Sequence, residues 1–188
     1  MKIPKIYLDT VIIRKLIEKR PAILLNLMRT IKERKWVCFS STLGILELSD
    51  LKKDDVYLRH KVKEKEEYKE IIKTRDQKKL NSDDLKAVKE YISHFLSKYP
   101  FFSAYQAPKE IWGDALTITL NSNIHSVDAV HLAVALGFKA DILVTSDTHF
   151  ITEANNLLNK YGYNKKIKVV SPEKVFDALS ELGFNLEK

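Results

Sequence analysis

Four short, almost unbroken apolar runs, separated by segments with helical spacing, constrain the fold of this chain more than any other feature. The runs are "IYL" (6–8), "WVCF" (36–39), "ILVT" (142–145) and "IKVV" (167–170). Strands that are buried on both faces are apolar throughout, which is typical of a parallel sheet covered by helices. The pattern therefore predicts an α/β fold in three layers, with a central parallel sheet of four to five strands flanked by helices.

The segments between these runs carry apolar residues at helical spacing. The expected helices include residues 24–31, 82–99, 127–136 and 171–179. Ser126 and Ser171 are suited to N-cap positions, and Gly137 is suited to the end of a helix. Helices that alternate with strands in this way indicate crossover connections, which parallel strands require.

Size and composition point to one cytoplasmic domain. A chain of 188 residues is long enough for a single domain with a sizeable core. No apolar run approaches the roughly 18 residues that a membrane span needs, and the first residues, "MKIPKIYLDT", lack the apolar stretch of a secretion signal. The single cysteine, Cys38, lies in an apolar run, so we expect a buried thiol and no internal disulfide.

Charge and glycine content narrow the function only slightly. The formal net charge of +7 permits a polyanionic partner, although many lysine-rich proteins bind no nucleic acid. Only five glycines are present, and no glycine-rich phosphate loop occurs, which disfavours nucleotide binding of that kind.

The middle of the chain is densely charged, with both signs intermixed over residues 51–79. One interpretation is a long solvated helix with pairs such as Lys63 and Glu67. The other is a basic flap over a nucleic-acid groove, which the near balance of acids and bases disfavours. We expect residues 51–107 to form a helical, charged insertion within one domain that spans residues 1–188.

Four acids occupy positions where α/β proteins place ligands, because ligands collect at the carboxyl ends of parallel strands. Asp9 directly follows the first apolar run, and Asp147 holds the matching place after "ILVTS". Glu47 lies in the first two turns of the helix after "WVCF". Asp128 lies in the first turn of the helix that precedes "ILVT". If that helix begins at the same edge of the sheet, the four carboxylates converge on one crevice.

Each acid also has a purely structural interpretation. Asp128 and Asp147 could be helix-terminal acids that the helix dipole stabilises. Asp9 and Glu47 are flanked by apolar residues and no Lys or Arg is adjacent, so burial would cost several kcal/mol unless each carboxylate is paired or ligated. Carboxylates within about 4–6 Å of one another repel unless a cation compensates them.

The ligand chemistry favours a hard cation. A set of carboxylates without cysteine suits Mg²⁺ or Mn²⁺ better than zinc. His131 lies three residues after Asp128, but its neighbours in "AVHLAVA" indicate a hydrogen-bonded core histidine rather than a ligand. His149 follows Asp147 and is a candidate substrate contact only.

Five segments carry a family resemblance: "YLDTVII" (7–13), "SSTLGILEL" (40–48), "SVDAVHLAVAL" (126–136), "ADILVTSDTHF" (140–150) and "VVSPEKVF" (169–176). Each is short, but all of them in this order resemble PIN-domain proteins. That family comprises small metal-dependent ribonucleases and includes the toxins of VapC-type toxin–antitoxin pairs. The resemblance covers roughly residues 3–50 and 108–178.

The resemblance implies a PIN-like domain that hydrolyses RNA and leaves a 5′-phosphate and a 3′-hydroxyl. It makes Asp9, Glu47, Asp128 and Asp147 an acidic quartet that holds Mg²⁺ or Mn²⁺ and carries the catalysis. One or two such ions would polarise the scissile phosphate and lower the pKa of a bound water. A single-stranded RNA would suit this cluster better than a duplex.

Further residues and partners follow from the same resemblance. Thr10 and Ser146 match polar positions beside the first and last acids and are expected substrate contacts. Arg14 and Lys15 are expected to meet the RNA backbone. An antitoxin protein and a second copy of the chain are the implied protein partners. The stretch between the second and third acids is longer than in compact toxin-type members, which leaves the substrate and a toxin role open.

Two other functions are open to a chain with these residues. A phosphatase of the haloacid-dehalogenase type would use Asp9 as nucleophile, but it requires a second acid two residues later, where this chain has Val11. A non-catalytic PIN-like module would bind RNA or a protein partner, with the charged middle segment as the interaction surface.

Overall fold

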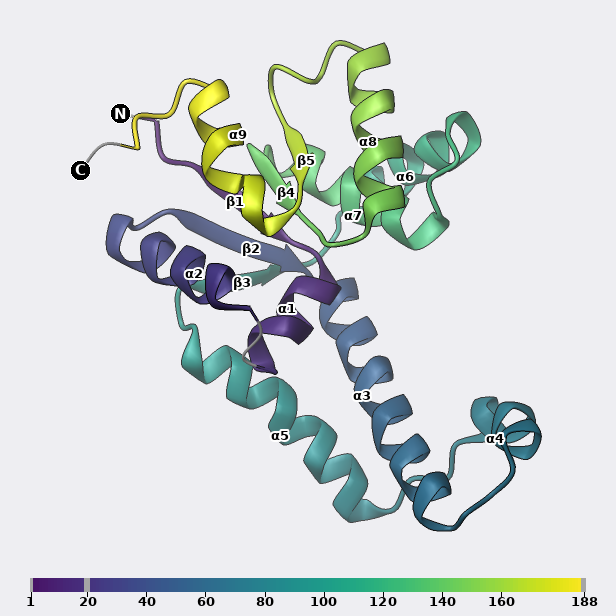
Figure 1. The fold of residues 1–188 in the computed structure, drawn as a ribbon. Helices are drawn as coiled ribbons and strands as arrows, with labels where there is room; N and C mark the ends of the chain where they lie inside the picture. Colours follow the sequence, from purple (N-terminus) through teal and green to yellow (C-terminus); the bar gives the residue numbers. More distant parts are fainter. Residues whose placement is uncertain (1, 19–20, 187–188) are drawn as a thin grey trace.

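A five-stranded parallel sheet forms the centre of the computed structural model, which describes residues 2–18 and 21–186 (Figure 1). The strands are β1 (Lys5–Leu8), β2 (Val37–Ser41), β3 (Phe102–Tyr105), β4 (Ile142–Val144) and β5 (Lys168–Val170). Their order across the sheet is β3-β2-β1-β4-β5, and every neighbouring pair is parallel. The predicted parallel α/β fold is confirmed at this level.

The predicted apolar runs coincide with β1, β2, β4 and β5 to within two residues, which is the usual uncertainty of a strand boundary. The sequence did not indicate β3, which lies inside the segment predicted to be helical (51–107). This strand forms the edge of the sheet beside β2, and only Phe102 among its residues is fully buried. With one buried residue and the polar Ser103 within it, the strand carries no continuous apolar run.

Nine helices occur in the described part of the chain: α1 (Thr10–Ile17), α2 (Ala22–Arg34), α3 (Thr42–Lys63), α4 (Tyr68–Thr74), α5 (Ser82–Lys98), α6 (Lys109–Asn121), α7 (Ser126–Gly137), α8 (Thr148–Lys160) and α9 (Val175–Glu181). The four predicted helices correspond to α2, α5, α7 and α9. The last of them begins as a 3₁₀ turn, Pro172–Lys174. Among the described residues, no helix combines the length and apolarity that a membrane crossing requires.

Alternate side chains of the strands point to opposite layers. Ile6 and Leu8 belong to the core under α1, α2, α5 and α9, whereas Tyr7 belongs to the core under α6, α7 and α8. Cys38 is 1% exposed, as predicted, and burial raises the pKa of its thiol. Both faces of the sheet are therefore covered, which is the three-layer arrangement of Figure 1.

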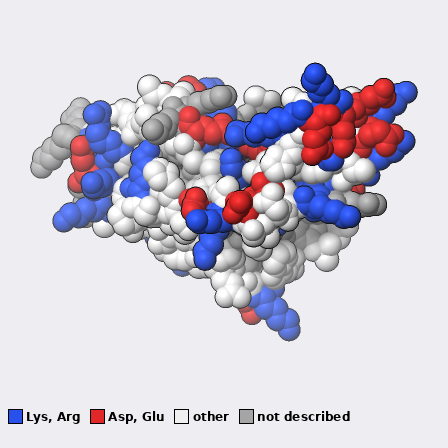
Figure 2. All heavy atoms as spheres, turned by 90° about the horizontal axis from the view of Figure 1, so that it is seen from below, with Lys and Arg blue, Asp and Glu red and all other residues white. Residues whose placement is uncertain are grey.

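Helix α3 extends beyond the sheet and carries α4 at its far end, and α5 leads the chain back (Figure 1). The charged segment is thus not one helix: α3 ends at Lys63, before Glu67, so these two residues do not form a pair within a helix. Asp54 of α3 instead forms ion pairs with Arg75 and Lys78, which connect α3 to the segment between α4 and α5. In Figure 2 acids and bases lie intermixed toward the end where α4 lies.

Candidate metal centre

The carboxyl ends of the strands bring the four predicted acids together. Asp9 follows β1, Asp147 follows β4, Glu47 lies in α3 after β2, and Asp128 lies in the first turn of α7. All four line one cleft of about 590 Å³. The residues that complete its lining are Thr10, Val11, Arg14, Asp50, Leu51, Asp54 and Ser146. Helix α7 therefore begins at the same edge of the sheet as the acids that follow the strands.

Asp9 and Asp147 each cap the helix that follows them. Asp9 is 6% exposed, and its Oδ1 accepts a hydrogen bond from the backbone N–H of Thr10 at 2.6 Å. Its Oδ2 accepts a hydrogen bond from Oγ1 of Thr145, also at 2.6 Å. Oδ1 of Asp147 accepts a hydrogen bond from the backbone N–H of Phe150 at 2.9 Å. The helix-cap interpretation is thus confirmed for Asp147, and it applies to Asp9 as well.

Glu47 is paired with a buried histidine. Its Oε2 lies 2.6 Å from Nε2 of His131 and accepts a hydrogen bond from Oγ1 of Thr10 at 2.8 Å. Nδ1 of His131 lies 2.6 Å from the hydroxyl of Tyr7, which donates to Oγ of Ser41. Because both ring nitrogens have partners and the side chain is 1% exposed, His131 is the hydrogen-bonded core histidine that the sequence predicted.

The same histidine carries a positive charge between two acids. Burial alone would lower the pKa of His131, but Tyr7, Glu47 and Asp9 raise it to about 10. Its Nε2 lies 3.6 Å from Oδ1 of Asp9, so the imidazolium faces both carboxylates. In this protonation state Nδ1–H donates to the Tyr7 oxygen and Nε2–H donates to Glu47. His131 is therefore the distant cationic partner that a buried Glu47 requires.

The three aspartates are less well compensated than Glu47. Burial and the charges of Asp9 and Asp147 raise the pKa of Asp128 to about 6, although His131 acts in the opposite direction. Burial also raises the pKa of Asp9, despite the hydrogen bonds that it accepts from Thr145 and Thr10. Negative charge therefore accumulates in the cleft beyond what one imidazolium neutralises, and a cation would relieve it.

The donor set suits a hard divalent cation, but its present geometry does not enclose one. Among residues 2–18 and 21–186, no three His, Cys, Asp or Glu side chains are grouped closely enough to hold a metal ion as they stand. The cap hydrogen bonds use only part of the acceptor capacity of Asp9 and Asp147, since each ionised carboxylate has about four lone-pair sites. Asp9, Asp128 and Asp147 are the residues that would hold the ion.

Comparisons with known proteins do not identify a family. A scan against models of protein families finds no match to this chain, and a search of curated proteins finds no match either. The resemblance to PIN-domain proteins therefore stays a prediction that is based on the five sequence segments.

The predicted substrate contacts divide into two groups. Thr10, Ser146 and Arg14 line the cleft, whereas Lys15 and His149 do not. The guanidinium of Arg14 donates hydrogen bonds to Glu18, the C-cap residue of α1, and to Asp55 of α3. The charge of Lys15 acts on Glu173 instead, and that residue lies near the start of α9. Nε2 of His149 lies 3.1 Å from the backbone oxygen of Asn123.

Sequence reasoning missed three contributors to the cleft. Tyr7 supports His131, Thr145 holds Asp9, and Asp54 extends the acidic wall along α3. A signal was present for the first two, because each is a polar group at the end of, or within, an apolar run and needs a partner when buried. Nothing in the sequence marked Asp54 among the many charges of its segment.

Gly44 permits the close approach of α3 to β2, α1 and α7. We expect Gly44→Ala to destabilise the protein by about 1–3 kcal/mol. A Cβ at this position would lie 2.8 Å from Oγ of Ser40, 3.1 Å from Oγ1 of Thr10 and 3.3 Å from Cε1 of His131. Denaturant unfolding measures the loss. The buried Oγ of Ser40 has no hydrogen-bond partner, so Ser40→Ala should cost little alone and restore part of the loss in the double variant. Strictly additive effects would contradict this account.

The metal-free protein should become less stable as the pH rises from about 5 to 9. The pKa of Asp128 is raised to about 6, so the folded state binds more protons than the unfolded chain between about 4 and 6. The pKa of His131 is raised to about 10, and its stabilising charge is complete below about 6.5 and lost toward 10. Thermal unfolding in EDTA across this range measures the trend, and a midpoint that rises with pH would refute it.

Proposed function

We propose that this protein is a divalent-metal-dependent endoribonuclease. The observation that carries the proposal is the cleft that Asp9, Glu47, Asp128 and Asp147 share. Burial raises the pKa of Asp9 and of Asp128, the charges of Asp9 and Asp147 raise that of Asp128 further, and His131 is the cation that lies within 4 Å of Glu47 and Asp9. Retaining several repelling carboxylates at the ligand-binding edge of a parallel sheet costs stability, which favours a role in binding a cation.

Mg²⁺ or Mn²⁺ held by these carboxylates would polarise a phosphodiester and lower the pKa of water for its hydrolysis. Asp9, Asp128 and Asp147 would bind the ion. Glu47, fixed by Thr10 and His131, would orient the attacking water through its free carboxylate oxygen. The hydrogen bonds of Thr145 to Asp9 and of Thr10 to Glu47 keep both carboxylates aimed at the cleft.

Arg14 is the residue best placed to meet the phosphates of the substrate. It lines the cleft, its side chain is 33% exposed, and Glu18 and Asp55 hold its guanidinium in place. A guanidinium suits phosphate because it donates two parallel hydrogen bonds. Single-stranded RNA is the proposed substrate, since its flexible backbone can bend into a narrow cleft.

Purified protein should cleave single-stranded RNA in the presence of Mg²⁺ or Mn²⁺ and stop when EDTA is added. Cleavage at defined positions, with 5′-phosphate and 3′-hydroxyl ends, is the expected product pattern. Adding Mn²⁺ after EDTA should restore the activity. Cleavage that persists in EDTA would point to a contaminating nuclease and overturn the proposal.

The absence of a closed metal-binding geometry among the described side chains favours one rival, a non-catalytic module that binds RNA. Binding that survives EDTA, with no cleavage of several RNAs, would support that rival instead. The phosphatase alternative has less support, because Val11 lines the cleft where a second acid would be needed. Failure to trap a phosphorylated Asp9 would eliminate it.

A further inference from the structure

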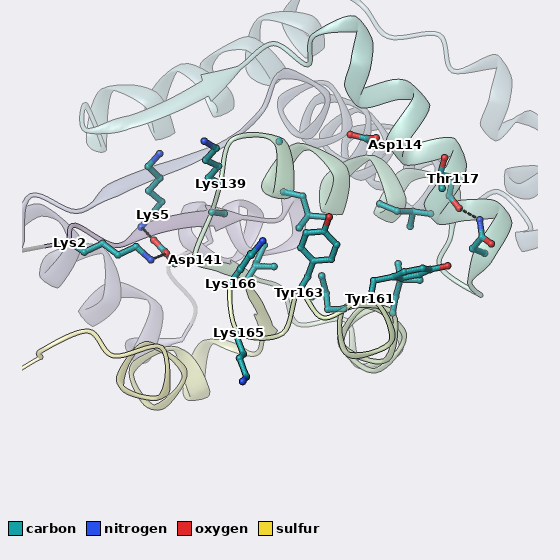
Figure 3. A pocket seen from close by; sticks show the side chains of 18 of the residues that line it. Lys2, Lys5, Asp114, Thr117, Lys139, Asp141, Tyr161, Tyr163, Lys165 and Lys166 are labelled. Carbon is teal, nitrogen blue, oxygen red and sulfur yellow. Dashed lines mark hydrogen bonds and ion pairs between the residues drawn. The ribbon is translucent and has the colours of Figure 1, made fainter.

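A second, larger cavity lies at the opposite edge of the sheet from the acidic cleft. Its volume is about 910 Å³, and Lys5, Asp141 and Ile167 in its lining stand at the amino ends of β1, β4 and β5. Residues of α6, of the end of α7 and of α8 line it (Figure 3). None of the acids of the candidate metal centre lines it. The cavity is therefore a separate site.

Hydrocarbon groups make up most of the wall. Its apolar side chains are Ile3, Ile118, Leu136, Leu157, Leu158 and Ile167, of which Leu158 and Ile167 are almost fully buried. Two of the three polar side chains that α6 contributes bond to their own helix: Oγ1 of Thr117 donates to the Gly113 oxygen, and Nδ2 of Asn121 donates to the Thr117 oxygen, while Asp114 offers no donor. The α6 wall therefore offers few free donors for reading the edge of a nucleobase.

The rim of the cavity is basic. Lys2, Lys5, Lys139, Lys165 and Lys166 line it, against only two acids, Asp114 and Asp141. Asp141 is already satisfied, because its carboxylate lies 2.5 Å from Nζ of Lys2 and accepts a hydrogen bond from the backbone N–H of Lys5 at 2.9 Å.

The lysines lie on the side of the cavity away from Thr117 and Tyr161, and their side chains point in different directions (Figure 3). Within this group, those of Lys5 and Lys139 point the same way, and Lys166 reaches toward Tyr163. Nζ of Lys166 lies 5.2 Å from the centre of the Tyr163 ring, so this ammonium group lies beside an aromatic ring that also lines the cavity. Within the described residues, Lys5, Lys139 and Lys166 form no salt bridge to a carboxylate. Their positive charge is therefore available to a ligand.

We propose that this cavity binds a small amphipathic anion with a hydrocarbon body and one carboxylate head, the chemistry of a medium-chain fatty acid. The apolar wall between α6 and α8 would take the hydrocarbon, and the positive charge of Lys5, Lys139 and Lys166 at the rim would attract the carboxylate. The volume falls within the range of about 300–1,000 Å³ that is typical of small-molecule sites. This site does not depend on the proposed ribonuclease activity.

Isothermal titration of the whole protein with four probes tests the ligand chemistry. Decanoate should bind about tenfold more tightly than decanol, because the alcohol has no charge to pair with the lysines. Adenosine monophosphate and inorganic phosphate should bind more weakly than decanoate. Equal binding of decanol would refute the role of the lysines, and tighter binding of either phosphate compound would refute the hydrocarbon body.

Two variants with matched controls locate the site. Replacing Lys5, Lys139 and Lys166 by Gln should weaken decanoate binding at least tenfold, whereas the same change at Lys32, Lys63 and Lys89, which lie on α2, α3 and α5, should not. Thr117→Trp should fill the groove and abolish binding. Leu116→Trp on the exposed side of α6 is its control. If both triple variants, or both tryptophan variants, bind decanoate as the parent does, the assignment is wrong.

Discussion

Asp128→Asn is expected to reduce RNA cleavage by at least about 100-fold and, at the same time, to stabilise the metal-free protein by about 1 kcal/mol. Its carboxylate is disfavoured by burial and by the charges of Asp9 and Asp147, which raise its pKa to about 6. The neutral amide removes that repulsion at pH 7.5, and it also removes the charge of a proposed metal ligand. Initial cleavage rates at saturating Mn²⁺ and thermal unfolding in EDTA measure the two effects.

The opposite signs distinguish this role from a purely structural one. If Asp128 only stabilised the helix dipole, its neutralisation would lower the stability of the protein by a few tenths of a kcal/mol and leave the cleavage rate unchanged. Asp83→Asn is the matched control, since Asp83 lies in the first turn of α5 and does not line the cleft. An Asp128→Asn variant that cleaves RNA at the parent rate would remove Asp128 from the proposed metal ligands.

The central strands and their helices could be predicted from the sequence, because a strand that is buried on both faces consists of an unbroken run of apolar residues. The inner strands β1, β2 and β4 carry that signal, and the edge strand β5 was predicted from its run "IKVV" although only Val169 of the strand is buried. The other edge strand, β3 (Phe102–Tyr105), has a single buried residue and the mixed sequence "FSAY", so no apolar run marks it. For the same reason the prediction that residues 51–107 form a helical insertion did not include this strand.

For the candidate site, the sequence predicts which acids lie at the carboxyl ends of the strands. Asp9 directly follows β1 and Asp147 comes three residues after the end of β4, so parallel topology alone places them together. The pairing of Glu47 with His131 was not predictable in this way, because the two residues are 84 positions apart and meet only when α3 and α7 pack. A sequence reports that a buried carboxylate needs a partner, but the partner is chosen by tertiary packing.

His131→Leu is expected to destabilise the protein by about 3–5 kcal/mol, since breaking a buried ion pair leaves an uncompensated charge. His131 is 1% exposed and holds Glu47 at 2.6 Å and Asp9 at 3.6 Å. Leucine has a similar volume but supplies neither the charge nor the donor to Tyr7. Denaturant unfolding at pH 7, where the raised pKa keeps the imidazole charged, measures the loss.

The effect can be assigned to charge rather than to packing through Glu47→Gln in the same background. Neutralising Glu47 should recover part of the stability that His131→Leu removes. The same change in the parent should lower stability, because it leaves the buried imidazolium of His131 without its paired carboxylate. His149→Leu is the matched control, since this histidine is exposed and should change stability by no more than about 0.5 kcal/mol. If Glu47→Gln deepens the loss instead, His131 acts mainly by filling space, and the cleft holds less unbalanced negative charge than its use as a metal centre requires.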